Sequence, residues 1–127
     1  MHDSCNVARG SRMGNEAGGQ FTIPRNIIKA VSNNFHDMAS ETIGEATFCC
    51  GGGGGLLTDD LMEVRVKGAL PRMNAFNNVV QGQQVNFMAT FCAICKAQFT
   101  KVLPYYGFDM SMVGGVHQLV GTAIKLG

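Results

Sequence analysis

The chain has 127 residues, of which 46% are hydrophobic and 15% are charged, and its formal net charge is +1. This length predicts a single domain, and this composition is typical of a folded protein and excludes a disordered tail. The Lys and Arg residues are scattered without interleaved aromatic side chains, so no nucleic-acid partner is expected. No apolar run approaches the roughly 18 residues that a membrane-spanning helix needs, so no direct membrane span is expected either.

The first half of the chain predicts a loop, a helix and a strand. The opening segment MHDSCNVARG carries a cysteine at position 5, and we interpret it as the start of the C-terminal part of a longer subunit, cut just after a strand. Residues 10–22 are rich in glycine and polar side chains and predict a loop. Residues 23–35 have apolar side chains at helical spacing, with Pro24 suited to the first turn. A short strand is expected near residues 45–50.

The second half predicts helices and strands in alternation. Thr58 and the two aspartates after it, Asp59 and Asp60, predict the start of a helix that runs to about Lys67. Gly68 and Pro71 interrupt this pattern, and a second helical stretch is expected from Pro71 onwards. The remaining sequence predicts a strand before the last cysteine pair, a helix over 96–106, a strand within 108–115 and a terminal helix over 116–126.

Strands that alternate with helices indicate an α/β fold, here a small, mostly parallel sheet flanked by helices. In such sheets, binding sites lie where a strand ends and the chain turns into a helix. The five cysteines all fall at expected strand-to-helix loops: Cys5, Cys49, Cys50, Cys92 and Cys95. We therefore predict that they converge on one site.

Several uses of these cysteines are open at this level. Five is an odd number and nothing indicates export, so ligands or redox groups are favoured over a disulfide framework. The Cys92 and Cys95 pair has the spacing of metal sites and of thioredoxin-like redox pairs alike. Soft thiolates also bind zinc, so a zinc-binding or metal-free structural module is an alternative. The adjacent Cys49 and Cys50 diverge from the backbone, which is awkward for one ion and suits a polynuclear cluster.

Five glycines follow the adjacent cysteines, at positions 51–55. An ordered glycine run is destabilising because glycine loses more backbone freedom on folding than any other residue. Without side chains, Gly51 and Gly52 let the backbone come close to a cluster and point their amides at an anionic centre. We therefore predict that both contribute to cofactor binding, with a flexible loop as the alternative.

The cysteine pattern resembles that of a known family. Cys5, the Cys-Cys-Gly motif at 49–51 and CAIC at 92–95, with 43 and 41 residues between the cysteines of successive parts, resemble the cysteine-rich CCG domain of heterodisulfide reductases. The stretches CCGGGGGLLTDDLMEVRVKGALPR, CAICKAQFTKVLPYYGF and GVHQLVGTAIKLG resemble most the HdrD-like catalytic subunit of the sulfite-reductase-associated Dsr membrane complex, the DsrK branch. The resemblance covers essentially all of residues 1–127, as one CCG-type iron-sulfur domain.

This resemblance implies an oxidoreductase. In the family, the five cysteines of a CCG motif bind a non-cubane 4Fe-4S cluster, so the ligands implied here are Cys5, Cys49, Cys50, Cys92 and Cys95. The implied reaction reduces or forms a disulfide or trisulfide on a small sulfur-carrier protein in dissimilatory sulfur metabolism. The implied partners are that carrier and other subunits of a membrane-bound complex, which would hold a cytoplasmic chain at the membrane. The upstream cubane-cluster motifs of the family and a second CCG unit are missing from this sequence, so a fragment that binds a cluster but is inactive is also consistent with it.

Four further side chains have two interpretations each. His2 and His117 are either surface or capping residues or groups that position protons or substrate sulfur. Lys96 and Lys101 follow the last cysteine pair, and they either face solvent or offset cluster charge and guide an acidic partner. The eight methionines are expected mostly in the core, with a docking surface as the alternative.

Overall fold

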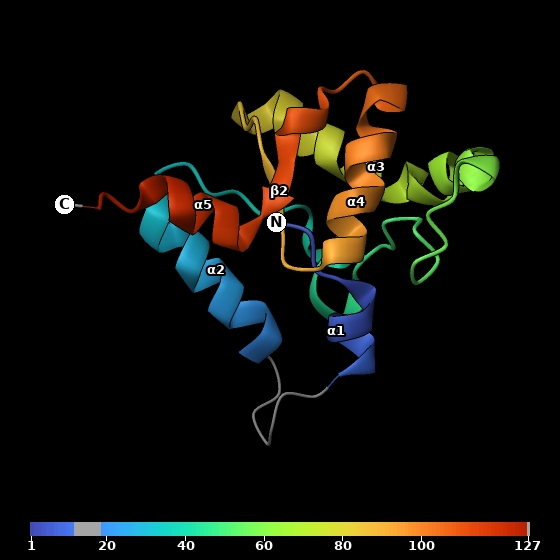
Figure 1. Ribbon diagram of the computed structural model, residues 1–127. Coiled ribbons are helices and arrows are strands. Elements are labelled where there is room, and N and C mark those ends of the chain that lie inside the picture. The colour runs from blue at the N-terminus through green and yellow to red at the C-terminus, as the bar shows by residue number, and fades with distance from the viewer. Residues whose placement is uncertain (12–18, 127) are drawn as a thin grey trace.

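The computed structural model describes residues 1–11 and 19–126. Helices surround a small central sheet, as Figure 1 shows. On one side lie α2 (Gly19–Val31) and α5 (Val116–Ala123), and on the other side lie α3 (Met62–Gln83) and α4 (Ala93–Val102), with the short α1 (Cys5–Gly10) near the start of α4.

The sheet consists of two strands in the described part of the chain. β1 (Met88–Thr90) and β2 (Val113–Gly115) pair in parallel, with their first residues opposite each other. His2 adds an isolated parallel bridge to Thr90, so the N-terminal segment lies beside β1. The expected α/β fold with a small parallel sheet flanked by helices is confirmed.

Helix α2 begins earlier than the sequence predicts. Of the loop expected over residues 10–22, residues 12–18 lie outside the described residues, and residues 19–22 are helical rather than loop. Pro24 therefore lies inside α2 instead of in its first turn, which leaves the Gln20 carbonyl without its usual intrahelical donor. Packing of α2 against α5 outweighs this local cost.

The prediction of a strand near residues 45–50 is wrong. This region forms two short 3-10 helices, Ser40–Thr42 and Gly44–Ala46, and then an extended segment outside the sheet. Arginine side chains take the carbonyls that a strand would offer to a neighbour: Arg9 donates to the Glu45 and Thr47 carbonyls at 3.0 and 2.8 Å. The buried Arg72 donates to the Thr42 carbonyl in the same way.

The helix break expected at Gly68 and Pro71 is also wrong, because α3 runs through both residues. A 3-10 turn at Asp59–Leu61 leads into α3 as expected, although the Thr58 hydroxyl makes no capping hydrogen bond. Gly68 serves a close contact, since a side chain there would lie 3.3 Å from the Gly51 Cα. Among the described residues, no helix combines the length and the apolar character needed to cross a membrane.

The C-terminal half follows the predicted order. After β1 come α4, a 3-10 turn at Leu103–Tyr106, a 3-10 turn at Met110–Met112, β2 and α5. The expected strand within 108–115 is confined to its last three residues. The chain between the parallel strands β1 and β2 thus passes through α4, which packs against both strands.

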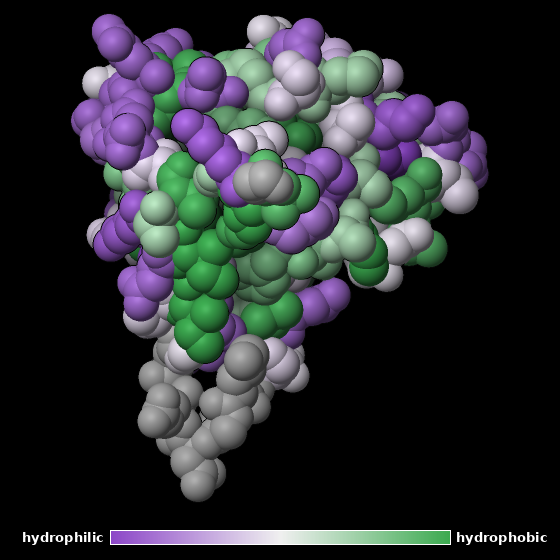
Figure 2. Space-filling model, turned by 60° about the vertical axis from the view of Figure 1, so that its left-hand side comes forward, coloured by the Kyte–Doolittle hydropathy of each residue, from purple (hydrophilic) through white to green (hydrophobic). Residues whose placement is uncertain are grey.

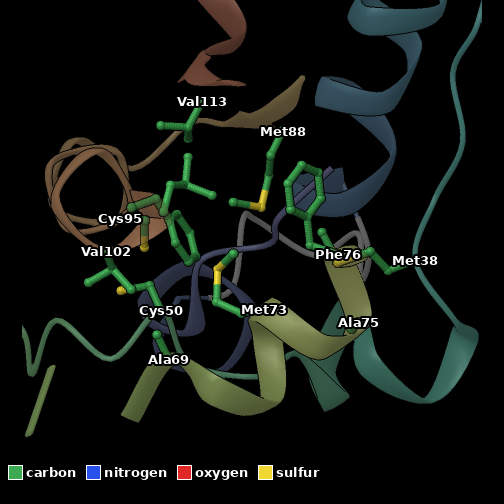
Figure 3. Packing of buried hydrophobic residues seen from close by; sticks show 12 residues of the cluster. Met38, Cys50, Ala69, Met73, Ala75, Phe76, Met88, Cys95, Val102 and Val113 are labelled. Carbon is green, nitrogen blue, oxygen red and sulfur yellow. The ribbon is translucent and has the colours of Figure 1, made fainter. Parts of the chain in front are cut away.

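The main core lies between α3, α4 and the sheet (Figure 3). Its most buried members are at most 2% exposed: Ala69, Met73, Phe76, Met88, Cys95, Phe99, Val102 and Leu103. Two of the cysteines, Cys50 and Cys95, belong to this cluster. The candidate site is therefore built into the edge of the core and not on a detached loop.

A hydrophobic band is exposed on the side formed by α2 and α5, as the green surface in Figure 2 shows. Ile23 and Ile27 on α2 are 52% and 39% exposed. With Val7, Phe91 and Val116, they line an apolar groove of about 340 Å³. Uncovered apolar surface of this kind often marks a contact with another protein.

Candidate functional site

The structure brings the five predicted cysteines together from three distant parts of the chain. The Cys49 thiol interacts with the thiols of Cys5 and Cys50. The Cys50 thiol in turn hydrogen-bonds to that of Cys95, and Cys95 interacts with Cys92. The five thiols are thus linked by pairwise interactions in the order Cys5, Cys49, Cys50, Cys95 and Cys92, which we call the row of thiols, and all five cysteines are free.

The row has a buried middle and accessible ends. Cys50 and Cys95 are buried, and Figure 3 shows both near α4, at the edge of the core cluster. Cys5 and Cys92 are partly buried, and Cys49 is exposed. Within residues 1–11 and 19–126, no three His, Cys, Asp or Glu side chains adopt the arrangement that would hold a single metal ion.

Local structure explains the position of each cysteine. Cys92 lies two residues after the end of β1 and is the N-cap of α4, whose first turn contains Cys95. Cys5 begins α1, three residues after the bridge that His2 makes to β1. These positions agree with the expected strand-to-helix placement. Cys49 and Cys50 instead end the extended segment that replaces the predicted strand.

The thiols differ in acidity because of their neighbours. The hydrogen bond from Cys95 lowers the pKa of Cys50 to about 6, although burial opposes this shift. The same contact raises the pKa of Cys95, so Cys50 is the thiolate of the pair and Cys95 its donor. Burial acts to raise the pKa of Cys92, but N–H groups of α4 and the Ser4 hydroxyl lower it. The metal-free site thus already favours anionic sulfur at two positions.

Two backbone amides of the glycine run point at sulfur. The Gly51 N–H lies 3.3 Å from the Cys49 Sγ, and the Gly52 N–H lies 3.4 Å from the Cys50 Sγ. Gly51 has a φ of +84°, and a Cβ there would lie 2.6 Å from the Arg65 carbonyl oxygen. Glycine at position 51 is therefore needed for close packing against α3 as well as for the amide geometry.

A buried polar network holds Cys50 in place, and the sequence analysis missed it. The Gln98 side chain is fully buried and donates to the Cys50 carbonyl at 3.0 Å and to the Arg65 carbonyl at 3.2 Å. Its own oxygen accepts a hydrogen bond from the Arg65 Nε at 2.8 Å. A glutamine between the apolar positions 95 and 99 of α4 is the signal that could have found it, since such a residue needs buried partners.

Arg72 is a second residue that the sequence analysis missed. Its guanidinium is fully buried and makes no ion pair with the carboxylates of the described residues. The Arg72 Nε has no hydrogen-bond partner of any kind in that part of the chain. Burial lowers the pKa of Arg72 to about 10, and the charges of Asp3, Asp37 and then Cys95 oppose this shift. A buried cation that forms no ion pair is costly unless anionic groups lie close by.

The other singled-out side chains have different surroundings. His2 is fully buried instead of lying at the surface, and its ring packs edge-on against Phe99 with centroids 4.9 Å apart. Burial, and then the charge of Arg72, lower the pKa of His2 to about 3, so it is neutral near pH 7. Lys96, Lys101 and His117 line an open groove next to Cys92.

The donor set fits an anionic iron-sulfur cluster. Thiolates are the usual ligands of such clusters, and N–H groups directed at sulfur stabilise them. The Arg72 Nε is buried without a hydrogen-bond partner in the described part of the chain, and Cys95 is one of the anionic groups near this guanidinium. An unsatisfied buried donor of this kind is what a site for an anion requires.

The comparisons with known proteins find relatives that are named as iron-sulfur subunits. No family model and no solved structure matches it. It is 45% identical over 125 residues to "Hdr-like menaquinol oxidoreductase iron-sulfur subunit 2" of Archaeoglobus fulgidus. It is 46% identical over 125 residues to "Hdr-like menaquinol oxidoreductase iron-sulfur subunit" of Archaeoglobus profundus. These alignments cover 98% of this chain, which spans about a fifth of the length of either relative. The chain is therefore homologous to one segment of the Hdr-like iron-sulfur subunits.

Proposed function

We propose that residues 1–127 form one domain of a longer Hdr-like oxidoreductase subunit, and that this domain binds a non-cubane 4Fe-4S cluster. The ligands in this proposal are Cys5, Cys49, Cys50, Cys92 and Cys95. The substrate is a disulfide or trisulfide on a small sulfur-carrier protein, which the site reduces or forms. A position in the Dsr-type branch of dissimilatory sulfur metabolism is part of the same proposal.

The observation that carries this proposal is the row of five interacting thiols. A mononuclear zinc site uses four ligands, whereas five linked thiols exceed that number and suit several irons. Adjacent Cys49 and Cys50 interact with different neighbours, Cys5 and Cys95, and so extend the row in opposite directions. This divergence supports a polynuclear group over a single ion.

The residues of the chain have separate roles in the proposed chemistry. A bound iron-sulfur cluster supplies single electrons for the cleavage of a sulfur–sulfur bond. The amides of Gly51 and Gly52 stabilise anionic sulfur at Cys49 and Cys50. Arg72 places a buried positive charge near Cys95. The exposed Cys49 leaves the site accessible to a protein-borne substrate.

Partner subunits are also part of the proposal. The relatives are named as menaquinol oxidoreductase subunits, so we infer a complex whose other subunits exchange electrons with a quinol. These subunits would attach a cytoplasmic chain to the membrane. The alternative is a zinc-binding or metal-free module of such a complex, since the same thiolates bind zinc.

Metal analysis tests the proposal. Protein that is reconstituted without oxygen is expected to contain iron and acid-labile sulfide in matching amounts, with an electron paramagnetic resonance signal that responds to a disulfide substrate. Stoichiometric zinc without sulfide would favour the alternative instead.

Cysteine variants separate a five-ligand cluster from a cubane. Each of the five Cys→Ser variants is expected to lose or alter the electron paramagnetic resonance signal. The control variant Thr100→Ser, which changes a residue of α4 beyond Cys95, should keep the signal. If one of the five variants leaves both the iron content and the signal unchanged, only four thiolates bind iron and the non-cubane assignment is wrong.

A further inference from the structure

A groove of about 550 Å³ starts at Cys92 and follows α4. Its lining from α4 repeats at helical spacing: Ala93, Lys96, Ala97, Thr100 and Lys101. The opposite face of α4 is buried: Cys95, Gln98, Phe99 and Val102. One face of α4 thus packs in the core and contributes Cys95 to the row. The other face contributes two lysines and several small side chains to the open groove.

The far wall of the groove comes from the end of β2. Gly115 and His117 line it, and β2 lies beside α4 in Figure 1. A Cβ at Gly115 would lie 2.3 Å from the His117 Cε1, so a larger residue there would displace the imidazole. The glycine therefore keeps space for the His117 ring at the edge of the groove, where a ring N–H can reach a ligand.

The groove is cationic, because lysines line it and no acidic side chain does. Its lining contains no Asp or Glu, and neither Lys96 nor Lys101 forms an ion pair within the described ranges. From residue 64 onwards, the chain carries six Lys and Arg residues and a single acidic residue, Asp109. Two of these cations, Arg65 and Arg72, are buried. The lysines of the groove therefore present much of the accessible positive charge of this half.

We propose that this groove binds an extended, carboxylate-bearing segment of the protein that carries the substrate sulfur. The inference rests on the proposed function, because it takes Cys92 to be at the reaction site. Lys96 and Lys101 are five residues apart on α4, or about 7.5 Å along the helix axis. Carboxylates on alternate residues of an extended peptide are about 6.6 Å apart and match this spacing. The nine residue-to-residue steps from Cys92 to Lys101 span about 13 Å, which is the length of about four extended residues.

Peptide binding tests this inference without turnover. The probe is a fluorescein-labelled hexapeptide, Glu-Gly-Glu-Gly-Glu-Cys, with its thiol methylated to prevent redox chemistry, and fluorescence anisotropy reports its Kd. A peptide with Gln in place of each Glu is the neutral probe. The Lys96→Gln/Lys101→Gln variant removes the charges of the groove. The Lys67→Gln/Lys125→Gln variant removes two exposed charges elsewhere and so has the same net charge.

We expect wild-type protein to bind the acidic probe and not the neutral one. The groove variant should bind the acidic probe at least tenfold more weakly, whereas the control variant should stay within twofold of wild type. Equal weakening in both variants would mean that only net charge matters, and it would overturn the inference. Absence of binding to wild-type protein would overturn it as well.

The same assay distinguishes this inference from the proposed function. It is run on metal-free and on iron-loaded protein, with iron content measured in parallel. Protein that loads iron and sulfide but ignores the acidic probe refutes the docking groove and leaves the proposed function intact. Protein that binds the probe through the lysines but loads no iron refutes the proposed function and leaves a cationic peptide groove.

Discussion

Replacing Gly51 with alanine is expected to destabilise the metal-free fold by about 3 kcal/mol. Gly51 has a φ of +84°, and for a residue with a side chain this conformation costs about 1 kcal/mol. The added Cβ would also lie 2.6 Å from the Arg65 carbonyl oxygen and 2.7 Å from the Ala69 nitrogen. Both are backbone atoms of α3 and cannot rotate away, so overpacking adds about 2 kcal/mol.

Gly54→Ala is the matched control. Gly54 lies in the same glycine run and also has a positive φ, of +72°, but an added Cβ there meets no atom within 4 Å. Its cost is the backbone term alone, about 1 kcal/mol. The free energies of unfolding are measured by urea titration with circular dichroism, without metal and under reducing conditions. If the two variants differ by less than about 0.5 kcal/mol, where about 2 kcal/mol is expected, the contact between Gly51 and α3 does not constrain the fold.

Three further predictions follow from buried polar groups. The pKa of His2 is about 3 in the folded chain and 6.5 in the unfolded chain, so the unfolded chain binds a proton first as the pH falls. When the pH is lowered from 7 to 5, the free energy of unfolding should therefore decrease by about 2 kcal/mol, and this decrease should be smaller in His2→Leu. Gln98→Leu should cost about 3 kcal/mol in urea unfolding, because the Arg65 Nε and the Cys50 carbonyl lose a buried partner. In iron-loaded protein, Arg72→Met should shift the midpoint potential of the cluster to more negative values in a potentiometric titration, because the reduced cluster loses a nearby positive charge.

Each of these predictions has a contrary outcome. An unchanged pH dependence in His2→Leu would mean that another group titrates. Gln81→Leu changes an exposed glutamine near the end of α3, and a similar loss there would show that the effect of Gln98→Leu is not local. A potential that shifts equally in Arg72→Met and in Arg72→Lys, which keeps the charge, would show that the size of the side chain, and not its charge, matters at this position.

Local periodicity predicted the second half of the fold well. The strand before Cys92, the helix after it and the terminal helix occur where the apolar spacing indicates them. Placement at strand-to-helix junctions also predicted that distant thiols meet, and this reasoning holds for Cys5, Cys92 and Cys95, whereas Cys49 and Cys50 do not follow a strand. These are the features that depend on contacts close in sequence or on the general geometry of sheets.

The errors arose from contacts between distant residues. Arg9 and Arg72 bind carbonyls in the 42–47 segment and so prevent the predicted strand, and nothing near that segment indicates them. Gly68 looks like a helix breaker until its contact with Gly51 is known. Charged residues are usually exposed, so the sequence alone could not indicate that Arg72 is buried near Cys95, whereas the apolar neighbours of Gln98 on α4 were a signal that this glutamine is buried.

The row of thiols has a topological consequence. It ties positions 5, 49–50 and 92–95, so a group bound to all three parts closes two large loops at once, with 43 and 41 intervening residues. Closing loops of this size removes disorder mainly from the unfolded chain, much as a pair of crosslinks does. Cofactor binding would then be the last step of folding, because it requires that the three parts of the chain have come together. Chains that fail to bring them together would not bind the cofactor and would remain susceptible to proteolysis.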